Sequence, residues 1–131
     1  MAKSFEHLEV FQSALDLSVD VYGVTKAFPP EERYGLVSQL RRASVSVVSH
    51  IAEGQGRLSW GEWRQLLSNA RGSLYEVEAQ VILARRLGLV PLEAHDALRK
   101  RTRFTGRLLA GLIRYVRKGE VSAKTKQQAK R

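Results

Sequence analysis

The sequence predicts an all-α protein, an antiparallel up-down-up-down bundle of four helices. Apolar residues recur every three or four positions through most of the 131 residues, and no stretch alternates with the two-residue period of a strand. Glycine- or proline-containing links at residues 28–30, 54–58 and 88–91 separate four such stretches. Because links this short join antiparallel neighbours, the helices are expected to run alternately up and down.

The first helix is expected over residues 8–27. Two adjacent apolar lines run along it, which predicts contact with more than one neighbour and extra surface for self-association. The lines are Leu8, Phe11, Leu15, Val19 and Tyr22, and Val10, Ala14, Leu17, Val21 and Val24. Phe28 precedes two prolines, so it is pushed out of the helical region and ends the helix.

The second helix, from about 32 to 53, has a wide apolar face with a ladder of polar residues beside it. Gly54 is expected to end it, since glycine tolerates a positive φ. The ladder consists of Gln39, Arg42, Ser46, Ser49, His50 and Glu53. Three interpretations are open: contact with another helix or subunit, exposure to solvent, or catalysis by Ser46 and His50. No third group accompanies these two to orient the histidine, which counts against catalysis.

The third helix is expected to begin at Ser59, whose spacing to Glu62 is that of a capping box, and to run to about Leu87. The fourth helix is expected over about 92–118. Residues 119–131 have too little apolar content to order themselves. The expected domain organisation is therefore one bundle, residues 1–118, followed by a basic disordered tail, residues 119–131.

The net charge of +9 comes from the last quarter of the chain. Residues 1–98 hold 10 Lys and Arg against 12 Asp and Glu, whereas residues 99–131 hold 12 against one. Seven of the cations fall within about 100° of arc on the fourth helix, opposite its apolar side. They are Arg99, Lys100, Arg103, Arg107, Arg114, Arg117 and Lys118.

No acid interrupts this face between Asp96 and Glu120, which favours contact with a polyanion. The aromatic residues Phe104 and Tyr115 fall on the apolar arc, so the expected contact is with backbone phosphates and without base stacking. A face that serves only solubility and a face that docks an acidic protein are the alternatives.

Several charged residues fall at or near expected core positions. Arg41 lies on the apolar side of the second helix, and Glu78 lies at the edge of the inward arc of the third. Because an unpaired buried charge is costly, we expect these two to interact directly or through a neighbouring subunit. Arg42, Glu53 and Arg101 are placed in the same class of structural ion pairs or interface contacts. A ligand-binding role for Glu78 is the alternative.

Several kinds of site are disfavoured. The chain has no cysteine, and its three histidines, His7, His50 and His95, lack metal-ligand spacing. There is no run of 18 uncharged apolar residues to span a membrane, and residues 1–10 lack the apolar core of a signal peptide. We expect a cytoplasmic protein with no metal, no other cofactor and no membrane partner.

Six short motifs occur, one after another, over roughly residues 5–88. They are Leu8-Glu9-Val10-Phe11-Gln12, Phe28-Pro29, Glu32-Arg33-Tyr34-Gly35, Gln39-Leu40-Arg41-Arg42-Ala43, Ile51-Ala52-Glu53-Gly54 and Gly72-Ser73-Leu74-Tyr75-Glu76-Val77-Glu78. In order and spacing they resemble bacterial four-helix-bundle proteins encoded in intervening sequences of the 23S ribosomal RNA gene. That family is similar in turn to the accessory variability determinant proteins of diversity-generating retroelements. The resemblance implies a ring-shaped homopentamer with a central channel. His50 departs from it, because the family usually has asparagine there.

The expected function is that of a non-enzymatic, oligomeric bundle that binds RNA or DNA. No acid–base or metal constellation indicates an enzyme. A ring would repeat the basic face and so strengthen binding to a polyanion. If the relationship to the retroelement proteins is the closer one, the partner would be a reverse transcriptase with its template RNA. The alternative is a scaffolding oligomer whose basic face docks a protein such as a reverse transcriptase.

Overall fold

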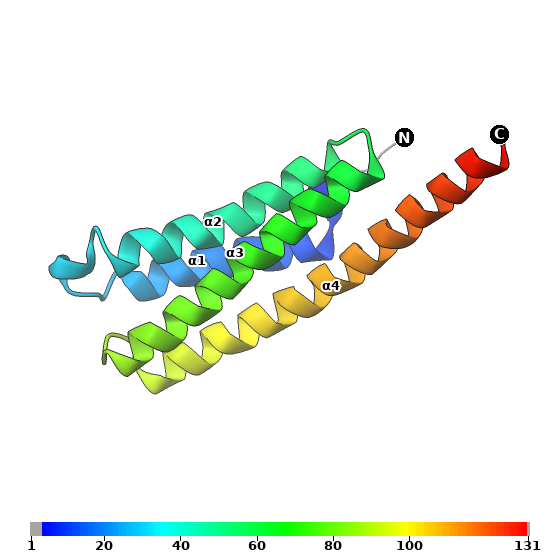
Figure 1. Ribbon diagram of the computed structural model, residues 1–131. Coiled ribbons are helices and arrows are strands. Elements are labelled where there is room, and N and C mark those ends of the chain that lie inside the picture. Colours follow the sequence, from blue (N-terminus) through cyan, green and yellow to red (C-terminus); the bar gives the residue numbers. More distant parts are fainter. Residues whose placement is uncertain (1–3, 131) are drawn as a thin grey trace.

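The computed structural model describes residues 4–130, and all regular secondary structure within them is helical. Two 3₁₀ turns precede the first two α-helices. The helices are α1 (Glu9–Thr25), α2 (Leu36–Gln55), α3 (Trp60–Arg86) and α4 (Leu92–Ala129), and the turns are Phe5–His7 and Pro30–Glu32. Successive helices lie antiparallel, and each packs against two neighbours in cyclic order (Figure 1). The predicted four-helix bundle is confirmed for the single chain.

The core is built from one inward stripe on each helix. Its largest fully buried side chains include Leu17, Leu40, Ile51, Leu67, Leu109 and Ile113. On α1 the apolar line through Leu17 and Val21 is buried, whereas Val19 and Tyr22 of the other line are 69% and 41% exposed. The line through Leu17 and Val21 therefore lies in the core, whereas the other line contributes Phe11 to the core and reaches the outer surface at Val19 and Tyr22.

A side-chain hydrogen bond that involves a serine or threonine hydroxyl joins every neighbouring pair of helices. The contacts are Ser18–Ser44 between α1 and α2 at 3.1 Å, Ser46–Ser73 between α2 and α3 at 3.0 Å, Thr102–Glu78 between α3 and α4 at 3.3 Å, and Ser13–Thr105 between α1 and α4 at 2.6 Å. Short side chains let the helix backbones approach closely, and the directional bonds set how far each helix is shifted along the next.

The sequence analysis predicted that Gly54 ends α2, and this prediction is wrong. The helix continues to Gln55, and Gly88 is the one residue with a positive φ (75°) in the described part of the chain. At Gly54 the constraint is packing, because a Cβ there would lie 2.7 Å from Trp63 Cδ1 of α3. At Gly88 the constraint is conformational. Its N–H bonds to the Arg85 carbonyl, and the Leu89 N–H bonds to the Ala84 carbonyl, which together close α3 in a Schellman motif.

The fourth helix does not end near residue 118, and the predicted disordered tail is wrong over residues 119–129. The helix α4 continues to Ala129, and its end beyond Glu120 runs clear of the other helices (red in Figure 1). The residues there are mostly good helix formers that extend an existing helix, so they need no apolar face. Glu120 accepts a hydrogen bond from Arg64 Nε at 3.0 Å, which ties this part to α3. Residues 1–3 of the predicted bundle and residue 131 of the tail lie outside the described residues.

Replacing Gly54 with alanine is expected to destabilise the protein. Inside a helix the change from glycine to alanine normally adds about 0.5–1 kcal/mol of stability, but here the new methyl group meets the Trp63 ring. Overpacking of this kind typically costs about 1–3 kcal/mol. Gly72→Ala is the matched control, because Gly72 lies within α3 and a Cβ there has no neighbour within 4 Å. Urea denaturation should show a loss for the first variant and a gain for the second; a gain for both contradicts the packing role.

The contact between Ser13 and Thr105 gives a second prediction. Thr105→Val removes the hydroxyl 2.6 Å from buried Ser13 Oγ, and leaving a buried polar group without its partner costs about 1–3 kcal/mol. Adding Ser13→Ala to this variant removes the stranded hydroxyl, so the double variant should be no less stable than Thr105→Val alone. Chemical denaturation of all four proteins in this double-mutant cycle measures the coupling, and additive losses would show that the two hydroxyls act independently.

Candidate nucleic-acid interface

Six of the seven basic residues predicted on the fourth helix are exposed along α4. They are Lys100, Arg103, Arg107, Arg114, Arg117 and Lys118. The helix is uninterrupted from Leu92 to Ala129, so its 3.6-residue period keeps these side chains on one side over its whole length. The result is a continuous band of positive charge, which we call the α4 basic band.

Arg99 differs from the other six. Its side chain is half-buried, and its Nε lies 4.0 Å from Glu78 Oε2 of α3. Thr102 Oγ1, 3.3 Å from the same carboxylate oxygen, lies on the same side. Arg99 therefore belongs to the contact between α3 and α4, and the predicted basic face lies beside α3 instead of directly opposite the core.

A groove of about 410 Å³ runs between α3 and α4. It is lined by Arg71, Leu74, Tyr75, Glu78, Thr102, Arg103, Gly106, Arg107 and Ala110. We call it the α3–α4 groove. Gly106 of α4 adjoins Leu74 of α3 there, and a Cβ at this position would lie in van der Waals contact with Leu74 Cδ2 at 3.5 Å. Arginines of both helices face this groove.

The sequence analysis did not single out Arg71, and it named Tyr75 only as part of a sequence motif. In the structure Tyr75 is 64% exposed. The signal for this pair was the spacing of Arg71, Tyr75 and Glu78 at i, i+4 and i+7, which places all three on one side of α3. What the sequence did not show was that α4 brings its own arginines to the same place.

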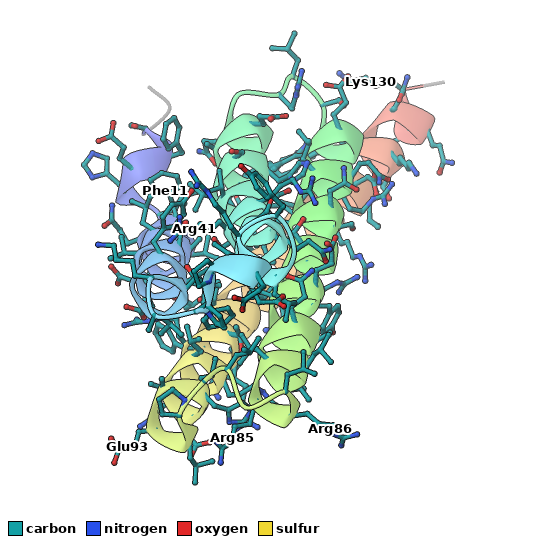
Figure 2. The ribbon with its side chains drawn as sticks, turned by 90° about the vertical axis from the view of Figure 1, so that its left-hand side faces the viewer. Phe11, Arg41, Arg85, Arg86, Glu93 and Lys130 are labelled. Carbon is teal, nitrogen blue, oxygen red and sulfur yellow. The ribbon has the colours of Figure 1, made fainter. Side chains whose placement is uncertain are left out.

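The expected direct contact between Arg41 and Glu78 is wrong within the chain. Arg41 lies between α1 and α2 (Figure 2), where its Nε donates to Thr25 Oγ1 at 2.9 Å. Its guanidinium carbon lies 4.5 Å from the centre of the Tyr22 ring, a cation–π contact. Glu78 instead meets Arg99 and Thr102 of α4. A charge on an apolar face was thus satisfied by a hydroxyl and an aromatic ring, which sequence spacing does not reveal.

Arg101 does form structural ion pairs, and its partners are on α1. Its guanidinium lies 3.4 Å from Asp20 Oδ2 and 3.7 Å from Asp16 Oδ2. These side chains are between about a third and two thirds exposed, so the pairs orient α4 against α1 more than they stabilise it. Arg42 is exposed, and Glu53 pairs at 3.6 Å with Arg57 near the end of its own helix.

Within the polar ladder of α2, Ser46 contacts another helix. Its hydroxyl lies 3.0 Å from Ser73 Oγ of α3, and Gln80 Nε2 of α3 donates to Gln39 Oε1 at 3.4 Å. His50 Nδ1 lies 2.9 Å from the Ser46 carbonyl oxygen, which can only accept, so this nitrogen carries a proton. The same nitrogen faces Ser46 Oγ at 3.1 Å and cannot take a proton from it. This geometry supports an interhelical role and not a nucleophile–base pair.

Residues 4–130 contain neither a metal-binding cluster nor a membrane-spanning helix. No three histidine, aspartate or glutamate side chains there gather closely enough to hold a metal ion. None of the helices in that range combines the length and hydropathy needed to cross a membrane.

The chain is similar to a known family over most of its length. The family described as 23S rRNA-intervening sequence protein matches residues 6–111. A crystal structure from Bacteroides thetaiotaomicron, described as a protein of unknown function from the S23 ribosomal protein family, has the same fold, with a TM-score of 0.75 at 20% identity. That match covers 80% of this chain and 95% of the other. No protein with a curated description matches. Because the family match includes α1, α2, α3 and half of α4, the chain belongs to the 23S rRNA-intervening sequence protein family.

Proposed function

We propose that the protein is a non-enzymatic bundle that binds RNA or DNA through backbone phosphates on the α4 basic band. The observation that carries this proposal is the extent of the band. It spans 19 residues from Lys100 to Lys118, a rise of about 27 Å at 1.5 Å per step. Each strand of duplex DNA carries one phosphate per about 3.4 Å of helix axis, so the band has room for several phosphates at once. The family's description, which refers to 23S rRNA, supports RNA as a partner.

The acidic residues nearest the band are already engaged within the protein. Glu120, with a side chain 18% exposed, is 3.0 Å from Arg64, and Glu78 lies 4.0 Å from Arg99. Neither carboxylate therefore opposes the field of the exposed arginines at full strength. A positive surface that keeps its counter-charges internal attracts a polyanion from outside.

Self-association is the second part of the proposal, and it rests on the opposite side of the bundle. Val19 and Tyr22 of α1 are exposed, and so is Val45 of α2 (41%). The contact between Arg41 and Tyr22 shows that these parts of α1 and α2 adjoin, and Val45 follows Arg41 by one helical turn. An apolar patch across two helices favours a protein neighbour. The resemblance of the sequence motifs adds a ring of five subunits as the expected form.

Substitution of Arg103, Arg107 and Arg114 by glutamine is expected to weaken binding and to reduce its salt dependence. Each lost phosphate contact lowers the slope of log affinity against log salt by about 0.9 for duplex DNA and about 0.7 for a single strand. The triple variant should therefore lose about two to three units of slope. Fluorescence anisotropy titrations are made at several KCl concentrations between 50 and 300 mM, in roughly twofold steps. They measure both the affinity and its dependence on salt concentration.

The control replaces Lys26, Arg33 and Arg86 by glutamine. These three are exposed cations away from α4, so the net charge changes equally while the α4 basic band is kept. The control should keep most of the slope and affinity. If both triple variants bind alike at every salt concentration, the band serves only solubility or a protein partner, and the proposed function is wrong.

Val45→Asp is expected to reduce the oligomer that the proposal requires. Placing a charge on the apolar patch of α1 and α2 makes its burial against a second subunit unfavourable. Light scattering of the unchanged protein should give a mass that is a multiple of 14.8 kDa, five times for the ring, and the variant should shift toward 14.8 kDa. Val121→Asp on the free end of α4 is the control, since Val121 is 63% exposed and lies far along α4 from this patch. A monomer for the unchanged protein at micromolar concentration contradicts self-association.

A further inference from the structure

The α3–α4 groove is lined by three arginines that are not paired with a carboxylate of the described residues. Arg71 of α3 faces Arg103 and Arg107 of α4 across the groove, and none of the three forms an ion pair with another residue between 4 and 130. The one carboxylate in the lining, Glu78, is paired with Arg99 outside the groove lining. Like charges brought together from two helices repel unless an anion lies between them.

The antiparallel register places the charges unevenly along the groove. Thr102 meets Glu78, and Gly106 adjoins Leu74, so positions later on α4 lie opposite positions earlier on α3. Arg107 therefore lies level with the Arg71 end of the groove, and Glu78 lies at the other end. An anionic group is therefore attracted more strongly to the Arg71–Arg107 end than to the Glu78 end.

Tyr75 lies between these two ends, and its ring is free. Among the four tyrosines, Tyr115 packs edge-on against Trp60 and Trp63, Arg41 covers Tyr22, and Arg33 lies 5.7 Å from the centre of the Tyr34 ring. Within the described part of the chain, neither an aromatic ring nor a cation stacks on Tyr75. A ring that is 64% exposed beside three arginines offers a flat apolar surface next to an anion site.

We propose that the α3–α4 groove holds one unpaired nucleotide of a single-stranded RNA or DNA. The base stacks on Tyr75, and the adjoining phosphates contact Arg71 and Arg107, with Arg103 on the strand's path along the α4 basic band. A flat aromatic base and a phosphate are the two chemical features that the groove complements. The volume of about 410 Å³ is within the range of small-molecule sites and accepts a group of this size.

A single strand is favoured over a duplex for a physical reason. In a duplex both faces of every base are covered by neighbouring base pairs, so a protein ring reaches only base edges or the backbone. Unpaired bases expose a face that an aromatic side chain can stack on. The α4 basic band alone would bind either form, whereas Tyr75 contributes only where a base is free. This inference rests on the proposed nucleic-acid function and adds which form of nucleic acid is selected.

Tyr75→Leu tests the inference. Removing a stacked aromatic residue typically weakens single-strand binding about five- to a hundredfold, and we expect the lower half of that range because a single ring is involved. Anisotropy is measured at one salt concentration with three labelled probes: a 20-nucleotide oligouridylate, a strand of equal length made only of abasic sites, and a 20-base-pair duplex. The variant should lose affinity for the oligouridylate alone, and Tyr75→Phe should restore it.

Tyr34→Leu is the matched control, because Tyr34 is 88% exposed and lies before α2, outside the groove. It should leave all three affinities unchanged. Equal losses on the oligouridylate and the abasic strand, or no loss on either, would overturn the stacking inference. The inference would also be overturned if unlabelled uridine monophosphate competed as strongly as unlabelled oligouridylate at equal molar concentration, because a free nucleotide would then be the ligand. These outcomes leave the proposed function standing, because that fails only if the Arg103, Arg107 and Arg114 variant binds like the Lys26, Arg33 and Arg86 control at every salt concentration.

Photocrosslinking gives a direct second readout. An oligouridylate with one 5-iodouracil should crosslink to Tyr75 of the unchanged protein, and mass spectrometry of the digested product identifies the residue. Crosslinks confined to side chains outside the groove would contradict the proposed position of the base, even if the affinities had changed as expected.

Discussion

The hydrogen bonds of hydroxyl groups at the four helix contacts set the register on which the rest of this bundle depends. Apolar contacts hold the helices together but have little directional preference, so they tolerate a shift of one helix along another. A buried hydroxyl such as that of Ser13 does not, because its one side-chain hydrogen bond in the described part of the chain is to Thr105 of α4, and a shift would leave it unpaired at a cost of about 1–3 kcal/mol. Ser44 and Thr105 are fully buried, and each meets a hydroxyl of a neighbouring helix. Such pairs make one alignment of the four helices more favourable than its neighbours.

This register also creates the candidate site. The contact of Thr102 with Glu78 fixes α4 against α3 at the height where Gly106 adjoins Leu74. Only in that alignment do Arg103 and Arg107 stand across from Arg71 with Tyr75 between them. A shift of one turn, about 5.4 Å, would move every arginine of α4 past its counterpart on α3. The polar contacts of the interior and the chemistry of the surface are therefore parts of one geometry.

The far end of the α3–α4 contact is held differently. Trp60 and Trp63 stack on one another at the start of α3, and Tyr115 of α4 packs edge-on against both. Gly54 and Gly119 lie against these indole rings, where a Cβ would collide. This aromatic cluster packs α4 against the start of α3. From there Lys130 and the free end of α4 lie at the opposite end of the bundle from Arg85, Arg86 and Glu93 (Figure 2).

The division of the surface suits the proposed assembly. The apolar patch of Val19, Tyr22 and Val45 lies on α1 and α2, and the α4 basic band lies beside α3. A neighbour that covered α1 and α2 would leave the α3–α4 groove open, and each added subunit would bring another groove within reach of the same strand. Repetition of a modest site at high effective concentration is a known route to tight binding of a polymer.

The sequence by itself determined the elements of the fold and the position of the charge. The 3.6-residue period identified all four helices and most of the core, and the count of cations after residue 98 located the α4 basic band, because both depend on residues close in the chain. Local spacing could not determine which charge meets which. Arg41 contacts Thr25 and Tyr22, Arg99 pairs with Glu78, and Tyr75 lies beside arginines of another helix. Those contacts depend on the rotation and the shift of each helix against the next, which only the packed tertiary structure decides.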